Sequence, residues 1–147
     1  MKIKGFGTIS KKEIETFEKE TGFIFPEDYR IFLEENNGGE PQEQENYIPL
    51  EGTDEKIMLN VLFGIGDELE KDFNIATWLK EFKNELPKTV IIIGVPEGGG
   101  VLLLSISEKK KGIFFWDNTF ELENSDEWNC MYKIADTFTE FVEKIEF

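Results

Sequence analysis

The chain has 147 residues, and its 39% hydrophobic content with 14 Phe and 3 Trp excludes a disordered chain and is sufficient for one folded core. Its 31 acidic and 16 basic residues give a formal net charge of −15, so most of the surface should repel nucleic acid. With no histidine and a single cysteine, Cys130, the sequence excludes Ser-His-Asp triads, an internal disulfide and most zinc sites.

No apolar run approaches the roughly 20 residues that a bilayer requires, so we expect no membrane contact. The N-terminal sequence MKIKGFGTIS lacks the apolar core and small-residue cleavage site of a signal peptide. These features predict a cytoplasmic protein.

The first 22 residues predict an extended arm followed by a helix. In residues 1–8, Ile3 and Phe6 stand among lysines and glycines, which indicates an arm or a short edge strand. Ser10 and Glu13 have the spacing of a capping box, in which each side chain takes an unpaired backbone N–H at the start of a helix. Gly22 is placed to end that helix in a left-handed conformation.

A second helix should complete a hairpin with the first. Residues 23–25 form an extended connector, because the residue before a proline disfavours helical angles, and Pro26 itself suits a first helical turn. Tyr29, Phe32 and Leu33 then share one face, and an Asn-Gly-Gly sequence ends the helix. The hairpin therefore has one apolar side.

Between residues 40 and 87 the pattern predicts loops, two short strands and a third helix. Residues 40–46 and 64–72 are polar loops, while residues 47–50 and 57–63 are apolar enough for strands. From about Asn74, apolar residues recur at helical spacing until Pro87: Ile75, Trp78, Leu79, Phe82 and Leu86.

Three apolar runs, residues 90–95, 101–106 and 113–116, predict the centre of the fold. The connections between them are short, so the strands should pair antiparallel. None of the runs alternates apolar with polar residues, which indicates a sheet covered on both faces. The triple glycine at 98–100 is expected to form a turn with positive φ angles, since a phosphate-binding loop would lead into a helix and Gly100 leads into VLLLSI.

The C-terminal part predicts a polar segment at 118–129, a last strand at 131–134 and a closing helix. Phe138, Phe141, Val142 and Ile145 line one face of that helix, with Asp136 or Thr137 as its cap. The complete pattern is α+β: a single domain over residues 1–147, with a central, mostly antiparallel sheet of about five to six strands. The N-terminal hairpin, the middle helix and the C-terminal helix should cover it.

The acidic residues are unevenly distributed. Eight acids and no base lie between Arg30 and Lys56, and five acids and no base lie between Lys111 and Lys133. Acidic loops often serve only solubility, and for either stretch alone that is the simpler interpretation. Together they indicate a surface suited to a cationic partner.

Four segments, in order, resemble the SMI1/KNR4 superfamily, also called SUKH: FPEDYRIFLEENNGG, IIIGVPEGGG, GIFFWDN and IADTFTEFVEKI. The resemblance covers nearly the whole chain and implies the same fold. It also implies one of two functions, because bacterial members are mostly immunity proteins that neutralise a cognate toxin, often a nuclease, whereas fungal members are regulatory scaffolds. Many relatives carry Asp directly after the glycine turn, where this chain has Val101, so a role tied to that acid is not carried over.

We therefore expect a non-catalytic protein that binds a toxin with a basic surface, or alternatively a protein-binding regulatory scaffold. A carboxylate enzyme is the least favoured interpretation, because the sequence has no calcium-loop pattern, and no cofactor or metal is expected. Trp116 could anchor a partner but is better explained as core. The expected partner-binding residues are Glu40, Glu43, Glu45, Glu97, Asp117, Glu121, Glu123 and Trp128.

Overall fold

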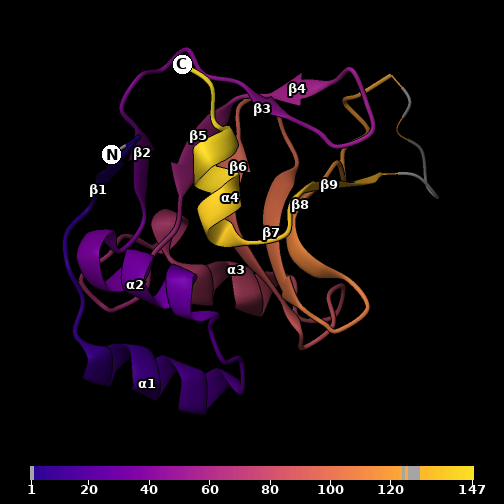
Figure 1. The fold of residues 1–147 in the computed structure, drawn as a ribbon. Coiled ribbons are helices and arrows are strands. Elements are labelled where there is room, and N and C mark those ends of the chain that lie inside the picture. Colours follow the sequence, from indigo (N-terminus) through magenta and orange to yellow (C-terminus); the bar gives the residue numbers. More distant parts are fainter. Residues whose placement is uncertain (1, 124, 126–129) are drawn as a thin grey trace.

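Seven strands form one antiparallel sheet in the computed structural model, which describes residues 2–123, 125 and 130–147 (Figure 1). The strand order is β1-β2-β5-β6-β7-β8-β9, and a separate two-stranded sheet pairs β3 with β4. The strands of the main sheet are β1 (Ile3–Gly5), β2 (Gly39–Pro41), β5 (Leu59–Leu62), β6 (Val90–Pro96), β7 (Val101–Ile106), β8 (Lys111–Trp116) and β9 (Met131–Ala135). Those of the small sheet are β3 (Ile48–Pro49) and β4 (Lys56–Ile57).

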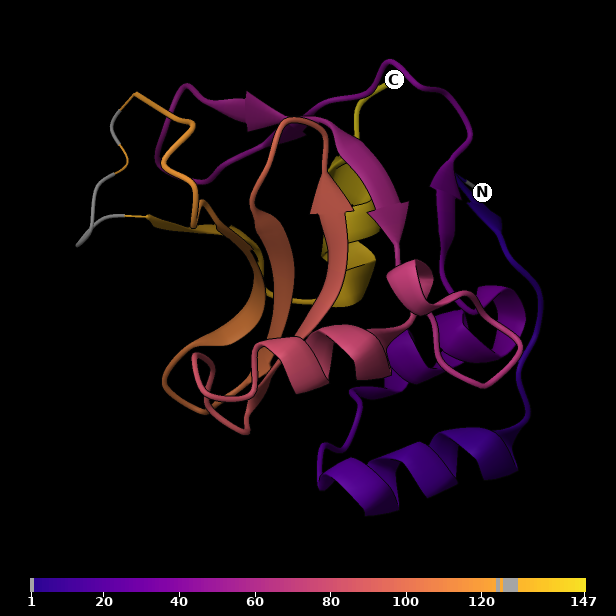
Figure 2. The same ribbon diagram turned by 180° about the vertical axis from the view of Figure 1, so that it is seen from behind.

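Helices cover both faces of the main sheet, as the unbroken apolar runs predict. Helix α4 lies on one face and α3 on the opposite face, while α2 packs beside α4 and α1 lies outside α2 (Figures 1 and 2). The helices are α1 (Lys11–Thr21), α2 (Glu27–Asn36), α3 (Ile75–Glu81) and α4 (Phe138–Lys144), and a short 3-10 turn, η1 (Lys71–Phe73), precedes α3. The predicted α+β class is confirmed.

The caps that the sequence predicts define the helix ends. The Ser10 hydroxyl accepts a hydrogen bond from the Glu13 N–H at 3.2 Å, and Gly22 ends α1 with a φ of 76°. Of the two candidate caps for α4, Thr137 is the one used, because its Oγ1 accepts from the Glu140 N–H at 3.1 Å. Ser10 and Thr137 each satisfy an N–H donor that the helix leaves unpaired, whereas the Gly22 N–H donates to the Glu18 carbonyl at the end of α1.

Contacts between aromatic rings join the helices to one another and to the sheet. On the face covered by α4, the Tyr29 ring of α2 meets Phe138 of α4 with centroids 4.9 Å apart. On the opposite face, Trp78 of α3 stacks on Phe63 at 4.9 Å. Phe82 then meets Trp116 of β8 edge-on at 6.0 Å, so Trp116 is a packing residue.

The sheet has more strands than the sequence predicts, because short outer strands extend it. Residues 39–41 form β2 and do not belong to a loop, and β1 pairs with them. A Cβ on Gly39 would lie 2.8 Å from Ile3 Cγ2, so only glycine permits this approach of the two strands. The run 57–63 is divided into β4 and β5, because the Asn46 side chain bonds both backbone groups of Leu59.

Helix α3 is shorter than its apolar spacing predicts. It ends at Glu81, and the N–H groups of Glu85 and Leu86 both bond the Phe82 carbonyl in successive turns, at 2.9 and 3.2 Å. Pro87 disfavours helical angles at Leu86, the residue before it, so these turns do not continue into a further helix. Across the described residues, no helix is long and apolar enough to cross a bilayer.

Candidate partner-binding surface

The glycine turn between β6 and β7 presents Glu97 at one end of the sheet. Gly98, Gly99 and Gly100 have φ angles of 90°, 123° and 79°, which confirms the predicted positive values. A Cβ on Gly100 would contact the Phe115 ring and lie 2.8 Å from the Trp116 carbonyl oxygen. The turn is therefore packed tightly onto β8. This packing fixes the backbone position from which the exposed Glu97 side chain extends.

Glu40 lies beside Glu97 although 57 positions separate them in the sequence. Both line a surface cavity of about 390 Å³, together with Gln44, Met58 and Asn60. The backbone N–H of Glu97 donates to the Met58 carbonyl at 2.7 Å, which holds the glycine turn against the segment leading into β5. The structure thus brings an acid of the first acid-rich stretch to the glycine turn.

Asn46 fixes the loop that carries Glu43 and Glu45. Its buried side chain donates to the carbonyls of Glu43 and Leu59 at 3.2 and 3.3 Å, and accepts from the Leu59 N–H at 2.9 Å. Glu43 and Glu45 are exposed on this loop, and the Glu45 carboxylate accepts from the Tyr47 hydroxyl at 3.0 Å. That hydrogen bond raises the pKa of Tyr47.

The second acid-rich stretch reaches the same end of the sheet. A Cβ on Gly99 would lie 3.0 Å from Thr119 Oγ1 and 3.4 Å from Glu121 Cγ, so this segment packs directly beside the glycine turn. Glu121 and Glu123 are both exposed there. Acids of both stretches therefore meet Glu97 at the turn, and we call the following six exposed acids the acidic end: Glu40, Glu43, Glu45, Glu97, Glu121 and Glu123.

Asp117 has a structural role and not the surface role that the sequence predicts. It is fully buried, and its two carboxylate oxygens accept from the N–H groups of Glu121 and Leu122, each at 2.9 Å. Phe120, within this clamped loop, has a positive φ of 55°. Asp117 thus orients the segment that carries Glu121, while Trp128, the remaining expected contact, lies outside the described residues.

The carboxylates of the acidic end are not neutralised by neighbouring bases. Within residues 2–123, 125 and 130–147, none of the six takes part in an ion pair; the pairs there join Glu18 to Arg30, Glu146 to Lys56, Asp136 to Lys133 and Glu51 to Lys144. Free carboxylates of this kind accept charge-assisted hydrogen bonds from lysine and arginine. No three Cys, Asp or Glu side chains in that part of the chain gather as metal ligands.

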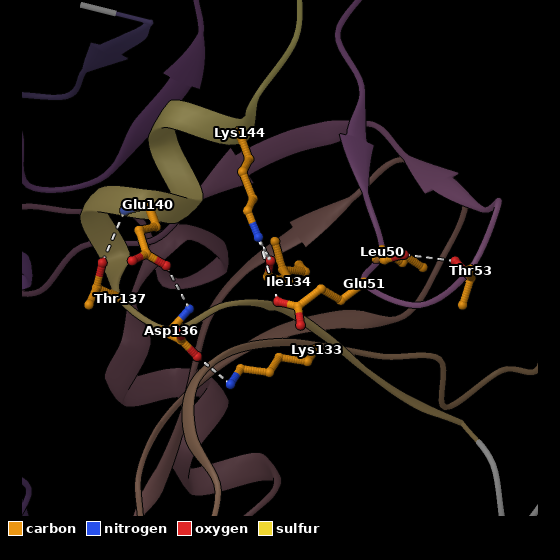
Figure 3. Close-up of polar contacts among 9 residues, drawn as sticks. All are labelled: Leu50, Glu51, Thr53, Lys133, Ile134, Asp136, Thr137, Glu140 and Lys144. Carbon is orange, nitrogen blue, oxygen red and sulfur yellow. Dashed lines mark hydrogen bonds and ion pairs between the residues drawn. The ribbon is translucent and has the colours of Figure 1, made fainter.

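Glu51, from the first acid-rich stretch, has a different environment (Figure 3). Its N–H donates to the Lys133 carbonyl at 2.9 Å, and its carboxylate lies 3.6 Å from Lys144 Nζ. Lys144 also donates to the Ile134 carbonyl at 2.6 Å, and Lys133 pairs with Asp136. This network fastens the turn after β3 to the junction of β9 and α4, so Glu51 stabilises the fold and does not belong to the acidic end.

The comparisons with known proteins give one result. The model of the SMI1 / KNR4 family (SUKH-1) matches residues 8–144, which is nearly the whole chain and includes every residue of the acidic end. A comparison with curated proteins finds no match.

Proposed function

The chain belongs to the SMI1/KNR4 family (SUKH-1), and on this basis we propose that it is an immunity protein that binds and neutralises a cognate secreted bacterial toxin. The family is known for immunity-like proteins. We further propose that the toxin is a nuclease with a basic surface, that the complex forms in the cytoplasm, and that no bond is made or broken in it.

The acidic end is the observation that supports this proposal. Segments distant in sequence meet at the glycine turn, and the six exposed acids of the acidic end have no ion-pair partner among the residues that the structure describes. A nuclease must attract the phosphates of its substrate, so carboxylates can occupy the same cationic surface. Blocking that surface is sufficient to inhibit the toxin.

The charge also suits the speed that immunity requires. Complementary potentials raise association rate constants to about 10⁸–10⁹ M⁻¹s⁻¹ at low salt, compared with about 10⁵–10⁶ M⁻¹s⁻¹ for neutral surfaces. The effect weakens as salt rises, because the Debye length shortens. An antidote that binds before its toxin reaches substrate benefits directly from this attraction.

Co-expression with the toxin encoded next to this gene tests the proposal. We expect cells that carry both genes to survive, and the association rate constant of the purified pair to fall as salt rises. The charge reversals Glu97→Lys and Glu121→Lys together should lower that rate constant by about tenfold or more. The reversals Glu15→Lys and Glu20→Lys, on exposed positions of α1, change the net charge equally and should have a much smaller effect.

Two results would contradict the proposal. Cells that die despite co-expression would show that the protein does not neutralise the adjacent toxin. A deletion phenotype in cells without any toxin gene would instead favour a regulatory scaffold with an endogenous partner. Equal effects of the two pairs of charge reversals would remove the acidic end from the interface without removing the immunity function.

A further inference from the structure

An apolar groove lies at the opposite end of the sheet from the glycine turn. It has a volume of about 170 Å³ and lies between α3, the chain after α3 and the first residues of β6. Leu79, Phe82, Leu86 and Val90 line it and are each only half-buried. A cavity of roughly 150 Å³ is sufficient for a benzene molecule, so the groove has the size of one large apolar side chain.

The wall of the groove is held in place by neighbouring packing. Trp78, at its edge, stacks on Phe63 and on Phe82 with centroids 4.9 and 6.0 Å apart. The indole N–H of Trp78 also donates to the Asp72 carbonyl at 3.1 Å. The groove is thus a preformed surface that binds without ordering its own wall.

The charge around the groove is opposite to that of the rest of the molecule. The charged residues that line it are Lys83 and Lys88, both exposed. Residues 80–111 contain six lysines and four acids, whereas the whole chain has 16 bases and 31 acids. Among the residues that the structure describes, no ion pair involves any of these six lysines.

The β7–β8 turn brings three of those lysines to the same end. The Ile106 N–H donates to the Thr89 carbonyl at 2.9 Å, so the chain that leads from β7 to residues 109–111 starts beside the chain that enters β6 (Figure 2). Of the four acids, Glu97 lies at the far end of β6, in the acidic end. The groove therefore combines an apolar floor with a basic rim.

We propose that this groove binds an acidic segment of a second protein partner, with one large apolar side chain inserted between α3 and β6 and flanking carboxylates paired with Lys83 and Lys88. An apolar anchor in a pocket supplies most of the affinity of such contacts, and the surrounding charges select the partner. The basic partner of the acidic end does not fit this groove, because the lysines of the groove rim would repel a positively charged protein.

A synthetic peptide tests this binding directly. The probe has one tryptophan between three glutamates on each side, and its dissociation constant is measured by NMR titration of the intact protein. We expect the largest amide shifts at Leu79, Leu86 and Val90. Replacing the tryptophan of the peptide with alanine should weaken binding by about tenfold or more, because the anchor is lost.

Charge reversals supply the matched control. The double variant Lys83→Glu with Lys88→Glu should weaken binding of the peptide by about tenfold. The double variant Lys11→Glu with Lys12→Glu, at the distant start of α1, should change binding by less than about twofold. Equal losses in the two double variants, or no binding of the tryptophan peptide, would overturn the proposal. Self-association of the wild type that Lys83→Glu and Lys88→Glu abolish would also overturn it, by assigning the groove to a second copy of the chain.

Discussion

Asp117 connects the packing of the fold to the shape of the acidic end. Its buried carboxylate fixes the backbone of Glu121 and Leu122, and it does so beside a non-glycine residue, Phe120, in the left-handed region. Such a conformation is unfavourable for a bulky residue and persists only where surrounding contacts impose it. The two hydrogen bonds of Asp117 provide that constraint.

Asp117→Ala should therefore lower the free energy of unfolding by about 2 kcal/mol, because two N–H donors lose their acceptor. Urea denaturation measures the loss. Glu121→Ala, which removes an exposed carboxylate from the same loop, should change stability by less than about 0.5 kcal/mol. A similar stability for all three proteins would show that the clamp contributes nothing.

Tyr29 shows the opposite situation, a buried polar atom without a partner. Its hydroxyl has no hydrogen bond among the described residues, and burial raises the pKa of Tyr29. Tyr29→Phe removes the hydroxyl and should raise the free energy of unfolding by about 1 kcal/mol. Tyr132→Phe should lower it, since the Tyr132 hydroxyl lies 2.7 Å from Ser125 Oγ in a hydrogen bond.

The pH dependence of stability checks the same tyrosine. The pKa of Tyr29 is raised in the folded state, so folding favours the neutral hydroxyl. The stability of the fold is therefore unaffected by this group below its unfolded pKa of about 10, and it declines as pH rises further. The wild type should therefore lose stability above about pH 10 more steeply than Tyr29→Phe. Parallel curves for the two proteins would contradict the assignment.

At the scale of an element, the glycine turn offers a matched pair of substitutions. Gly98 and Gly100 both have positive φ, but a Cβ on Gly98 would meet no atom within 4 Å, whereas one on Gly100 would meet the Phe115 ring. Gly98→Ala should cost about 1 kcal/mol of backbone strain. Gly100→Ala should cost about 2 kcal/mol more, because β7 and β8 must separate. Equal melting temperatures for the two variants would contradict the close packing of the turn on β8.

The junction of β9 and α4 predicts a pH effect of defined direction. The hydrogen bond to Lys133 lowers the pKa of Asp136. A lowered carboxylate pKa contributes stability above the unfolded pKa of about 3.9, and this contribution is lost as pH falls through the folded value. The melting temperature of Asp136→Asn should be below that of the wild type at neutral pH and equal to it at the acid limit. A difference in melting temperature that persists at the acid limit would refute the pairing.

Local signals in the sequence were sufficient for most elements of the fold. The capping box at Ser10, the glycine at the end of α1 and the unbroken runs of β6, β7 and β8 depend on neighbours close in sequence, so their patterns predict them. Strand β2 depends on β1, more than 30 residues away, and has no pattern of its own. Its residues look like a polar loop.

The candidate site was predictable only in part for the same reason. The sequence shows which residues are acidic, but Glu40 and Glu97 line one cavity only because the sheet has the order β2-β5-β6. Two buried asparagines, Asn37 and Asn46, pin distant loops through side-chain bonds to Ile65 and Leu59. An asparagine in a polar stretch gives no sign of such a role. The sequence likewise gave no sign that Asp117 would be a buried hydrogen-bond acceptor.

For the whole molecule, the separation of the two ends predicts independent binding. Strand β6 starts at the basic-rimmed groove and ends at the glycine turn, and at about 3.3 Å per residue its seven residues span roughly 20 Å. Charges this far apart are screened from each other at physiological salt, where the Debye length is about 8 Å.

A saturating amount of the adjacent toxin should therefore change the dissociation constant of the tryptophan peptide by less than about twofold. The measurement is a peptide titration of the preformed complex, with the toxin alone as a control for direct binding. Mutual exclusion of the toxin and the peptide would place both on one surface and contradict the two-ended arrangement.

The outer strands of the sheet also bear on how the protein behaves at high concentration. Among the described strands, β1 and β9 are outermost, and each carries a lysine, Lys4 and Lys133. An edge strand without charged side chains offers free N–H and C=O groups with which a neighbouring copy can pair. A cation on the edge strand makes such stacking of strands unfavourable. At β1 the cation Lys4 opposes such stacking, and at β9 the Lys133 carbonyl is already bonded to the Glu51 N–H and is no longer a free acceptor for a neighbouring copy.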